Sequence, residues 1–324
     1  MRKEIDGIGN QAELQAVIFK LNEIGVFAPL GTADSHTAIQ ISSPGNDGVL
    51  QNMDPSSPQF AQLKSALKAT WSAGDFGEIA KHTAQEAEQF VKRIGIQPGT
   101  RVLDVACGTG NTAIPAARLG ADVIGVDIAT NSLQQAAKRA ASEHLRARFQ
   151  EGDAEQLPFG DGEFDYVVTM YGAMFAPRPD RVASELLRVC KPGGTIAMAN
   201  WTPEGFVGKT FRAMSEHVPP PPGIPAPILW GREDVVRERL GKGSSSIRAE
   251  RRPARFDYPF PPEEVVSFFR QYFGPTQVAF AKLDADGQEK LTKVLTSLWH
   301  EHNQSPNGRT LVEAEYLEVH AVRA

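Results

Sequence analysis

A short segment with glycines and one acidic residue has the composition of a ligand-binding turn. In RVLDVACGTGNTA, residues 101–113, an apolar run contains Asp104 and is followed by Gly108 and Gly110. Glycines at this spacing let a backbone turn tightly out of a strand and lie against a ligand before a helix begins. The letters also satisfy the glycine fingerprint of dinucleotide-binding proteins, so an NAD site is one candidate.

The charge of Asp104 distinguishes two cofactors that such a turn could hold. In a dinucleotide enzyme the turn and the following helix N-terminus receive a pyrophosphate, and a carboxylate beneath them would repel that anion. S-adenosylmethionine (SAM) instead has an ammonium group, a cationic sulfonium and no phosphate. The aspartate therefore favours SAM over NAD.

Polar residues at the ends of three later apolar runs suit an adenosine cofactor. Asp127 ends the run in VIGVDIA and can accept hydrogen bonds from both ribose hydroxyls. In GDAEQLPF, Asp153 can accept from the adenine amino group, and Ala154 can offer its backbone N–H. Met170 and Tyr171 end FDYVVTMY, where open α/β sheets bind their ligands.

Four segments occur in the order and near the spacing of a known family. VLDVACGTG, GVDIA, GDAEQLPF and LLRVCKPGG resemble the motifs of class I SAM-dependent methyltransferases, most closely those of ubiquinone- and menaquinone-biosynthesis type and related small-molecule enzymes. The resemblance covers about residues 70–200 well and 201–324 more loosely. One departure is Ala106, where the family usually has glycine.

The resemblance implies a cofactor and a set of residues that bind it. SAM is the expected cofactor and S-adenosylhomocysteine (SAH) the product. The segment before the first strand, with Trp71, is expected to cover the methionine end of SAM. The expected cofactor-binding residues are Trp71, Asp104, Ala106, Gly108, Gly110, Asp127, Ile128, Asp153, Ala154, Met170 and Tyr171.

The expected reaction is transfer of the SAM methyl group to a small, fairly hydrophobic acceptor by in-line displacement, catalysed mainly by alignment and desolvation. A base is needed only if the acceptor must lose a proton, and His82, Tyr171 and His217 are candidates for it or for positioning the acceptor. Aromatic residues indicate an apolar acceptor pocket: Phe175, Trp201, Phe206, Phe211 and Trp230. An NAD-dependent oxidoreductase and a non-catalytic SAM-binding protein remain alternatives.

An alternation of strands and helices must position these residues. Strands are predicted over 101–105, 122–126, 147–151, 164–170 and 195–200, and helices over 61–71, 78–94, 132–144, 180–189, 262–273 and 284–302. By analogy with the family, residues 246–256 and 310–322 complete a Rossmann-like α/β sheet of seven strands, mostly parallel, with an antiparallel last strand and helices on both faces.

The chain divides into an N-terminal extension and a methyltransferase domain. Residues 12–27 have the periodicity of an amphipathic helix, and a Ser-, Pro- and Gly-rich segment follows it. We therefore assign residues 1–60 to a helical extension with its linker, which serves as a lid or a dimer contact. Residues 61–324 form the methyltransferase domain, with a substrate-side insertion at 201–235.

Composition excludes several other classes of protein. The 324 residues have a formal net charge of -5, which gives no field that attracts nucleic acid or an anionic membrane. No run reaches the length of a membrane span, and no apolar signal peptide begins the chain, so a cytoplasmic protein is expected. Two cysteines are too few for a disulfide framework or a thiolate metal site, and no metal is expected. The expected partners are a small-molecule acceptor and, in a homodimer, a second copy. The arginines of SIRAERRPARF (246–256) are expected on a solvated edge strand.

Overall fold

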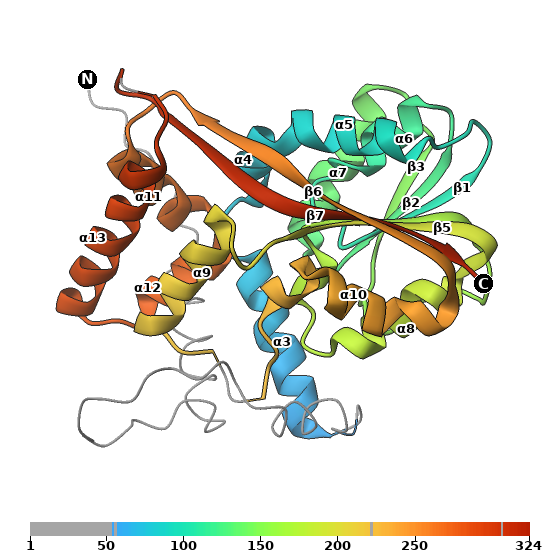
Figure 1. Cartoon of the computed structure of the whole chain (residues 1–324), viewed down its shortest axis with the longest axis horizontal. Coiled ribbons are helices and arrows are strands. Elements are labelled where there is room, and N and C mark those ends of the chain that lie inside the picture. The colour runs from blue at the N-terminus through green and yellow to red at the C-terminus, as the bar shows by residue number, and fades with distance from the viewer. Residues whose placement is uncertain (1–53, 55–56, 221–222, 306) are drawn as a thin grey trace.

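In the computed structural model, which describes residues 54, 57–220, 223–305 and 307–324, seven strands form a single sheet (Figure 1). The order across the sheet is β3-β2-β1-β4-β5-β7-β6. Strands β1 to β5 are parallel, and β7 is antiparallel to both of its neighbours, β5 and β6. The predicted Rossmann-like sheet is therefore confirmed. The strands are β1 (Arg101–Val105), β2 (Asp122–Asp127), β3 (Ala147–Glu151), β4 (Phe164–Met170), β5 (Cys190–Trp201), β6 (Ser244–Tyr258) and β7 (Thr310–Arg323).

Helices cover both faces of this sheet. On one side lie α5 (Ala84–Ile94), α6 (Ala113–Arg118) and α7 (Thr130–Ser142), and on the other α8 (Pro179–Val189) and α10 (Glu233–Leu240) (Figure 1). The amphipathic helix α5 buries Phe90 and Val91 completely in the core. The helix predicted over 12–27 lies outside the described residues. The helix predicted from residue 61 is α3 (Pro58–Ser72), so the proposed boundary at residue 60 falls inside it.

Two predicted elements differ from the structure. The helix expected over 78–94 consists of α4 (Phe76–Ala80), a 3-10 turn over 81–83, and α5. The break follows from Thr83, whose hydroxyl bonds back to the Ala80 carbonyl and whose backbone leaves the helical region. Strand β5 begins five residues earlier than expected, at Cys190, because the Pro-Gly-Gly segment continues the strand through a register irregularity opposite β4.

The antiparallel strands extend beyond the parallel part of the sheet. Trp201, the last residue of β5, pairs with Tyr316, whereas β6 and β7 continue pairing up to Tyr258 and Thr310. The chain between these last two residues therefore lies beyond the carboxyl ends of the parallel strands. It forms α11 (Pro262–Tyr272), α12 (Gly274–Ala281) and α13 (Ala285–His302), and α13 packs on α9 (Phe206–His217). Helix α12 was not predicted, since GPTQVAFA is buried on several sides and has no polar face.

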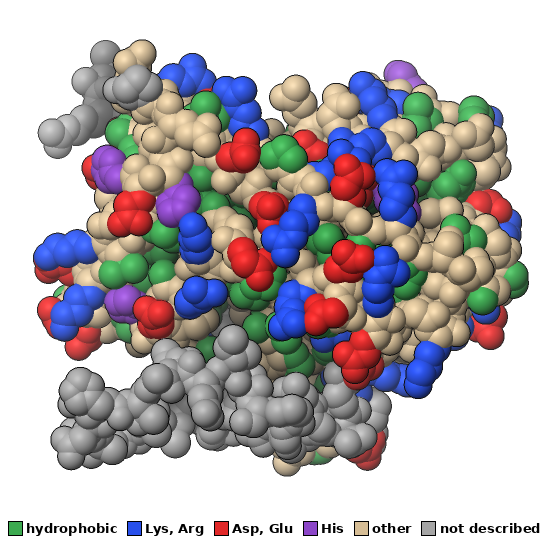
Figure 2. Space-filling model, viewed as in Figure 1, with side chains coloured by type: hydrophobic (Ala, Val, Ile, Leu, Met, Phe, Trp, Pro, Cys, Tyr) green, Lys and Arg blue, Asp and Glu red, His purple; other side chains and the backbone are tan. Residues whose placement is uncertain are grey.

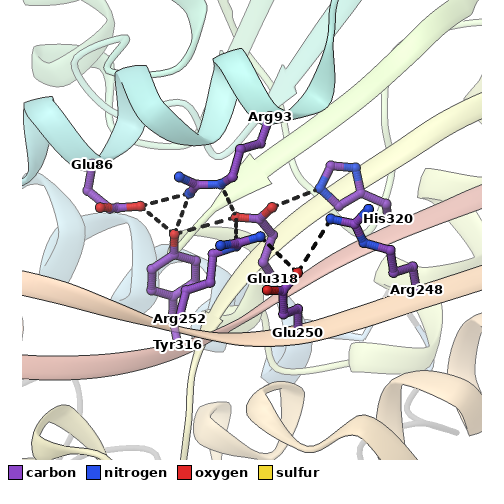
Figure 3. A network of polar contacts seen from close by, with 8 residues as sticks. All are labelled: Glu86, Arg93, Arg248, Glu250, Arg252, Tyr316, Glu318 and His320. Carbon is purple, nitrogen blue, oxygen red and sulfur yellow. Dashed lines mark hydrogen bonds and ion pairs between the residues drawn. The ribbon is translucent and has the colours of Figure 1, made fainter.

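A buried polar network joins α5 to the two antiparallel strands (Figure 3). The side chain of Glu318 on β7 is 1% exposed and accepts a hydrogen bond from Arg93 Nε of α5 at 2.8 Å. Its second basic neighbour is Arg252 of β6, at 3.2 Å. Burial opposes ionisation of Glu318, but the hydrogen bond from His320 and the two arginine charges hold its pKa below the usual value. The ionised carboxylate is therefore compensated inside the protein.

The outer strand has a different charge arrangement. β6 is the edge strand, as its arginines predict, and basic and acidic side chains are interspersed on this face of the molecule (Figure 2). Arg251, for example, lies 2.9 Å from Glu315 and 3.3 Å from Glu204. Such an edge is unfavourable for pairing with the strand of another chain.

We predict that Glu318→Gln destabilises the fold by about 3 kcal/mol, because it removes the buried charge that two arginines share. Glu250→Gln is the matched control, since Glu250 belongs to the same network but is half exposed. Its substitution is expected to cost less than about 1 kcal/mol. Urea denaturation of both variants at pH 7 measures the difference, and equal losses would contradict the importance of burial.

Candidate active site

A cavity of about 820 Å³ opens at the carboxyl ends of the parallel strands. Its volume lies in the range of small-molecule sites. One part of its wall consists of the turns after β1, β2, β3 and β4, and another of side chains from α9, α11, α12 and α13. Helix α3 and the residues after it complete the lining. The cavity thus joins the acidic strand ends to the helices of the β6–β7 connection.

Asp127 fixes the glycine turn against the end of the second strand. Its Oδ2 accepts a hydrogen bond from Gly108 N and its Oδ1 one from Ala129 N, both at 2.8 Å. Gly108 has φ +52° and Gly110 has φ +82°, a region that glycine adopts without strain. Burial raises the pKa of Asp127, while these N–H groups act in the opposite direction. A carboxylate thus faces the cavity beside the glycine turn, although its two oxygens already accept bonds.

Two residues other than glycine also adopt the left-handed conformation at this place. Ala106 has φ +55° and Tyr171 has φ +61°. Ala106 therefore tolerates the conformation for which the family usually has glycine. The residue after Tyr171 must be small, because a Cβ on Gly172 would lie 2.5 Å from the Ala106 carbonyl oxygen. The turns after β1 and β4 are thus in direct contact.

Asp104 supports the turn from below and does not line the cavity. The residue is fully buried, and its Oδ2 accepts a hydrogen bond from Thr112 Oγ1 at 2.6 Å. Burial raises its pKa to about 7, despite the bonds from Thr112 and the backbone of Ala113. The sequence predicts that the Asp104 charge faces the cofactor ammonium. In this structure the carboxylate lies behind the turn, outside the lining of the cavity.

Asp153, at the end of β3, lines the cavity with a basic partner that the sequence did not indicate. Lys64 Nζ of α3 lies 3.0 Å and 2.9 Å from the two Asp153 oxygens. The same ammonium lies 2.8 Å from buried Glu155. On the next turn of α3, Lys68 pairs with Glu151 at 2.5 Å. Helix α3 is therefore held to the end of β3 by ion pairs.

The structure brings together most of the predicted cofactor-binding residues. Gly110, like Asp104, lies outside the lining. The predicted residues that line the cavity are Trp71, Ala106, Gly108, Asp127, Ile128, Asp153, Ala154, Met170 and Tyr171.

The three candidate bases are less favourably placed. His82 packs on Tyr258 with its Nδ1 3.1 Å from the Asp257 carbonyl oxygen, and neither it nor His217 lines the cavity. Tyr171 lines it, but its ring stacks on Trp201 and burial raises its pKa well above the usual value. A tyrosine that stays protonated does not serve as a base.

Aromatic and aliphatic side chains line the part of the cavity away from the acidic strand ends. Four of the five predicted aromatic residues are among them: Phe175, Trp201, Phe206 and Phe211. Trp230 is instead buried in the core, with the Arg239 guanidinium 4.5 Å from its ring centre. Sequence reasoning missed the contributions of later elements, namely Phe256, Phe269, Phe273, Leu295 and Trp299. The apolar residues of VVSFFRQYF (265–273) indicate a buried face in the sequence. Only the tertiary fold determines that this face lines the cavity.

Comparisons with known proteins agree with this geometry. A family model described as "Methyltransferase domain" matches residues 102–194. An uncharacterized protein of Mycobacterium tuberculosis strain H37Rv is 40% identical over 226 residues, which cover 68% of this chain and 81% of that protein. The chain belongs to the class I SAM-dependent methyltransferases. The demethylmenaquinone methyltransferase of Renibacterium salmoninarum is 38% identical over 116 residues, which cover 36% of this chain and 47% of that protein.

Among solved structures, the YcgJ protein of Bacillus subtilis shares the methyltransferase fold. The TM-score is 0.52 at 17% identity, covering 74% of this chain and 98% of that one. The similarities support neither an NAD-dependent oxidoreductase nor a non-catalytic SAM-binding protein. Within the described residues, no helix of this methyltransferase combines the length and apolarity needed to span a bilayer. In the same ranges, no three His, Cys, Asp or Glu side chains are grouped as metal ligands.

We predict that Asp104 makes stability fall with rising pH. Its pKa of about 7 in the folded protein exceeds the value of about 4 of an unfolded aspartate, so the folded state binds the proton more tightly between these values. Stability is then lost as pH rises from about 4 to 7. In Asp104→Asn this loss should be absent, so that from pH 5 to 8 the parent loses about 2–3 kcal/mol more than the variant. Urea denaturation at both pH values measures it, and parallel changes would contradict the raised pKa.

Proposed function

We propose that this methyltransferase transfers the methyl group of SAM to a small, apolar acceptor bound in the aromatic half of the cavity. The observation that supports this most strongly is the continuity of the cavity. Acidic strand ends and a glycine turn occupy one half, and aromatic side chains the other. A polar cofactor and an apolar acceptor can therefore meet inside one enclosed space.

The residues of the cofactor half match the groups of SAM. Asp127 has the carboxylate that ribose hydroxyls require, and the glycine turn beside it leaves room for the methionine chain. Asp153 can accept from the adenine amino group if it shares its oxygens with Lys64. Met170 and Ile128 supply apolar surface for the flat base. We therefore propose these residues as the cofactor site, with Asp104 and Gly110 as its support.

The acceptor half is suited to alignment more than to proton transfer. When bound, SAM supplies a methyl group activated by its sulfonium. The rings of Phe175, Phe206 and Phe211 exclude water and restrict the acceptor to orientations that face this methyl. None of the three candidate bases has both access to the cavity and a suitable pKa. We propose that catalysis rests on alignment and desolvation.

The experiment that tests this function is a methyl-transfer assay with labelled SAM and a panel of phenols, amines and quinols that differ in apolar area. Titration with SAM, SAH and NAD accompanies it. We expect binding of SAM and SAH but not of NAD, and turnover that rises with the apolar area of the acceptor. Binding of NAD alone, or turnover only with charged acceptors, would contradict the proposal.

We predict that Asp127→Ala weakens SAH binding by about 1.5–3 kcal/mol, the scale of hydrogen bonds to a charged group. Asp122→Ala is the matched control, because Asp122 begins the same strand, pairs with Arg148 and does not line the cavity. Calorimetric titration with SAH should separate the two variants. Equal affinities would place the ribose elsewhere.

We predict that Phe211→Ala lowers kcat/KM for an apolar acceptor roughly 10- to 100-fold, the value of burying one large apolar side chain, and leaves the SAH affinity unchanged. Phe159→Ala is the control, since Phe159 packs on Phe164 outside the cavity. Steady-state kinetics measures kcat/KM for both variants, and titration with SAH measures their affinity for the product. A loss of SAH binding in Phe211→Ala alone would assign this ring to the cofactor half.

A further inference from the structure

One wall of the cavity comes from α9, β6 and the helices α11, α12 and α13. Within the described residues this wall has no charged side chain, and its hydrogen-bonding side chains are Thr210, Thr276 and the indole of Trp299. A charged group of a ligand would lose its hydration here without compensation. The wall therefore suits a neutral molecule, which the few polar side chains can orient.

The two threonine hydroxyls of this wall differ in their hydrogen bonding. Thr210 Oγ1 donates to the Phe206 carbonyl oxygen, one turn earlier in α9, at 3.0 Å. Thr276 is only 3% exposed, and its hydroxyl has no hydrogen-bond partner among the residues that the structure describes. It is not one of the sealed interior atoms without a partner, such as the Tyr258 hydroxyl. The Thr276 hydroxyl is therefore open to the cavity that the residue lines, where a ligand can satisfy it.

The sequence Gly274-Pro275-Thr276 determines the position of this hydroxyl. A Cβ on Gly274 would lie 1.9 Å from the Thr70 carbonyl oxygen, so the first turn of α12 packs directly on the end of α3. Proline in that turn has a fixed φ that suits the start of a helix. Thr276 follows Phe273 by three positions, about one helical turn, and both residues line the cavity.

This turn of α12 lies close to the proposed cofactor half. The ring centre of Phe273 is 5.9 Å from that of Trp71 and 6.2 Å from that of Phe76. Phe76 in turn lies against the glycine turn, since a Cβ on Gly108 would be 3.4 Å from a carbon of its ring. A ligand group bound to Thr276 is therefore held near the place where the cofactor is expected.

We propose that the Thr276 hydroxyl donates a hydrogen bond to an oxygen of the methyl acceptor, and that the acceptor is a neutral apolar molecule with a carbonyl or phenolic oxygen. The N-terminal end of α12 has the positive end of the helix dipole and no capping side chain, which favours an electronegative atom there. Trp299 adds a second donor to the wall, because an indole N–H cannot accept. This inference rests on the proposed function and specifies its substrate class. Thr276 is a positioning residue in this role.

The test measures the binding of two pairs of probes to the SAH-loaded protein, in which no methyl transfer can occur. The two naphthols carry the oxygen, and the two methylnaphthalenes have the same shapes without it. In the parent protein we expect a naphthol to bind more tightly than its methyl counterpart. In Thr276→Val, which replaces the hydroxyl by a methyl group, this affinity ratio should fall roughly 3- to 10-fold, the value of one neutral hydrogen bond. Equilibrium dialysis measures all four affinities.

Thr210→Val is the matched control, because Thr210 belongs to the same wall but its hydroxyl is already bonded within α9. Its affinity ratio should equal that of the parent protein. Thr276→Ser keeps the hydroxyl and should keep the ratio. If the valine variant does not fold, Thr276→Ala takes its place, and the same fall in the ratio is expected.

Equal affinity of the parent for naphthols and methylnaphthalenes would overturn the role of Thr276, as would an unchanged preference in folded Thr276→Val. A fall in SAH affinity in that variant would also overturn it, because the hydroxyl would then bind the carboxylate of the cofactor. Failure of all four probes to bind the parent protein would contradict the apolar acceptor half, and with it the proposed function.

Discussion

The site depends on a backbone constraint, the contact between the turns that follow β1 and β4. Ala106 and Tyr171 both adopt a left-handed conformation that costs a non-glycine residue about 1–2 kcal/mol. The surrounding sheet holds them there. Tyr171 N donates to the Ala199 carbonyl oxygen at 2.8 Å, and Cys107 N to that of Val126 at 3.0 Å. Because the backbone turns away at the same place after β1 and after β4, the ends of these strands open into a cavity. Backbone strain is thus stored where the ligand is expected.

The aromatic part of the cavity depends on a different feature, the length of β6 and β7. Their pairing continues past the last residue of β5, so that the helices between them are placed beyond the parallel strands. Glu318 and its arginines join these two strands to α5 (Figure 3). The polar network thus holds the two antiparallel strands against α5. Tyr316 belongs to this network and packs edge-on against Tyr171 of the cavity, which connects the two halves physically.

Sequence reasoning could predict which strand ends line the cavity, because backbone geometry determines where strand ends lie. Gly108 and Asp127 stand at strand ends, and the parallel sheet brings strand ends to one edge whatever the details of packing. The direction of a side chain is not determined in this way. Asp104 lies near the end of β1, just before the turn with Gly108, yet its side chain points behind the turn to Thr112. Lys64, which pairs with Asp153, could not be predicted, because the contact joins residues 89 positions apart.

The aromatic part of the cavity lining was predicted less well for a related reason. Phe206 and Phe211 were identified from the aromatic content of the 201–235 segment, but the same argument included Trp230, which packs in the core. Aromatic residues serve core and cavity equally, and their type alone does not separate the two uses. Phe269 and Trp299 lie in segments that were predicted as helices with no functional role. Their place at the cavity follows from the pairing of β6 with β7 and from packing between helices, which joins α13 to α9.

The ion pairs of α3 distinguish two carboxylates that follow β3, one buried and one on the wall of the cavity. Lys64 and Asp153 keep 21% and 33% of their side-chain surface exposed, so water screens this pair more than it screens the pair of Lys64 with buried Glu155. In the proposed cofactor site, the adenine amino group takes over part of the hydrogen bonding of Asp153. Lys64 retains Glu155, a carboxylate without solvent access that also pairs with Arg178. Lys64 thus keeps the helix attached to the segment after β3 through buried Glu155, while the partly exposed Asp153 carboxylate faces the cavity.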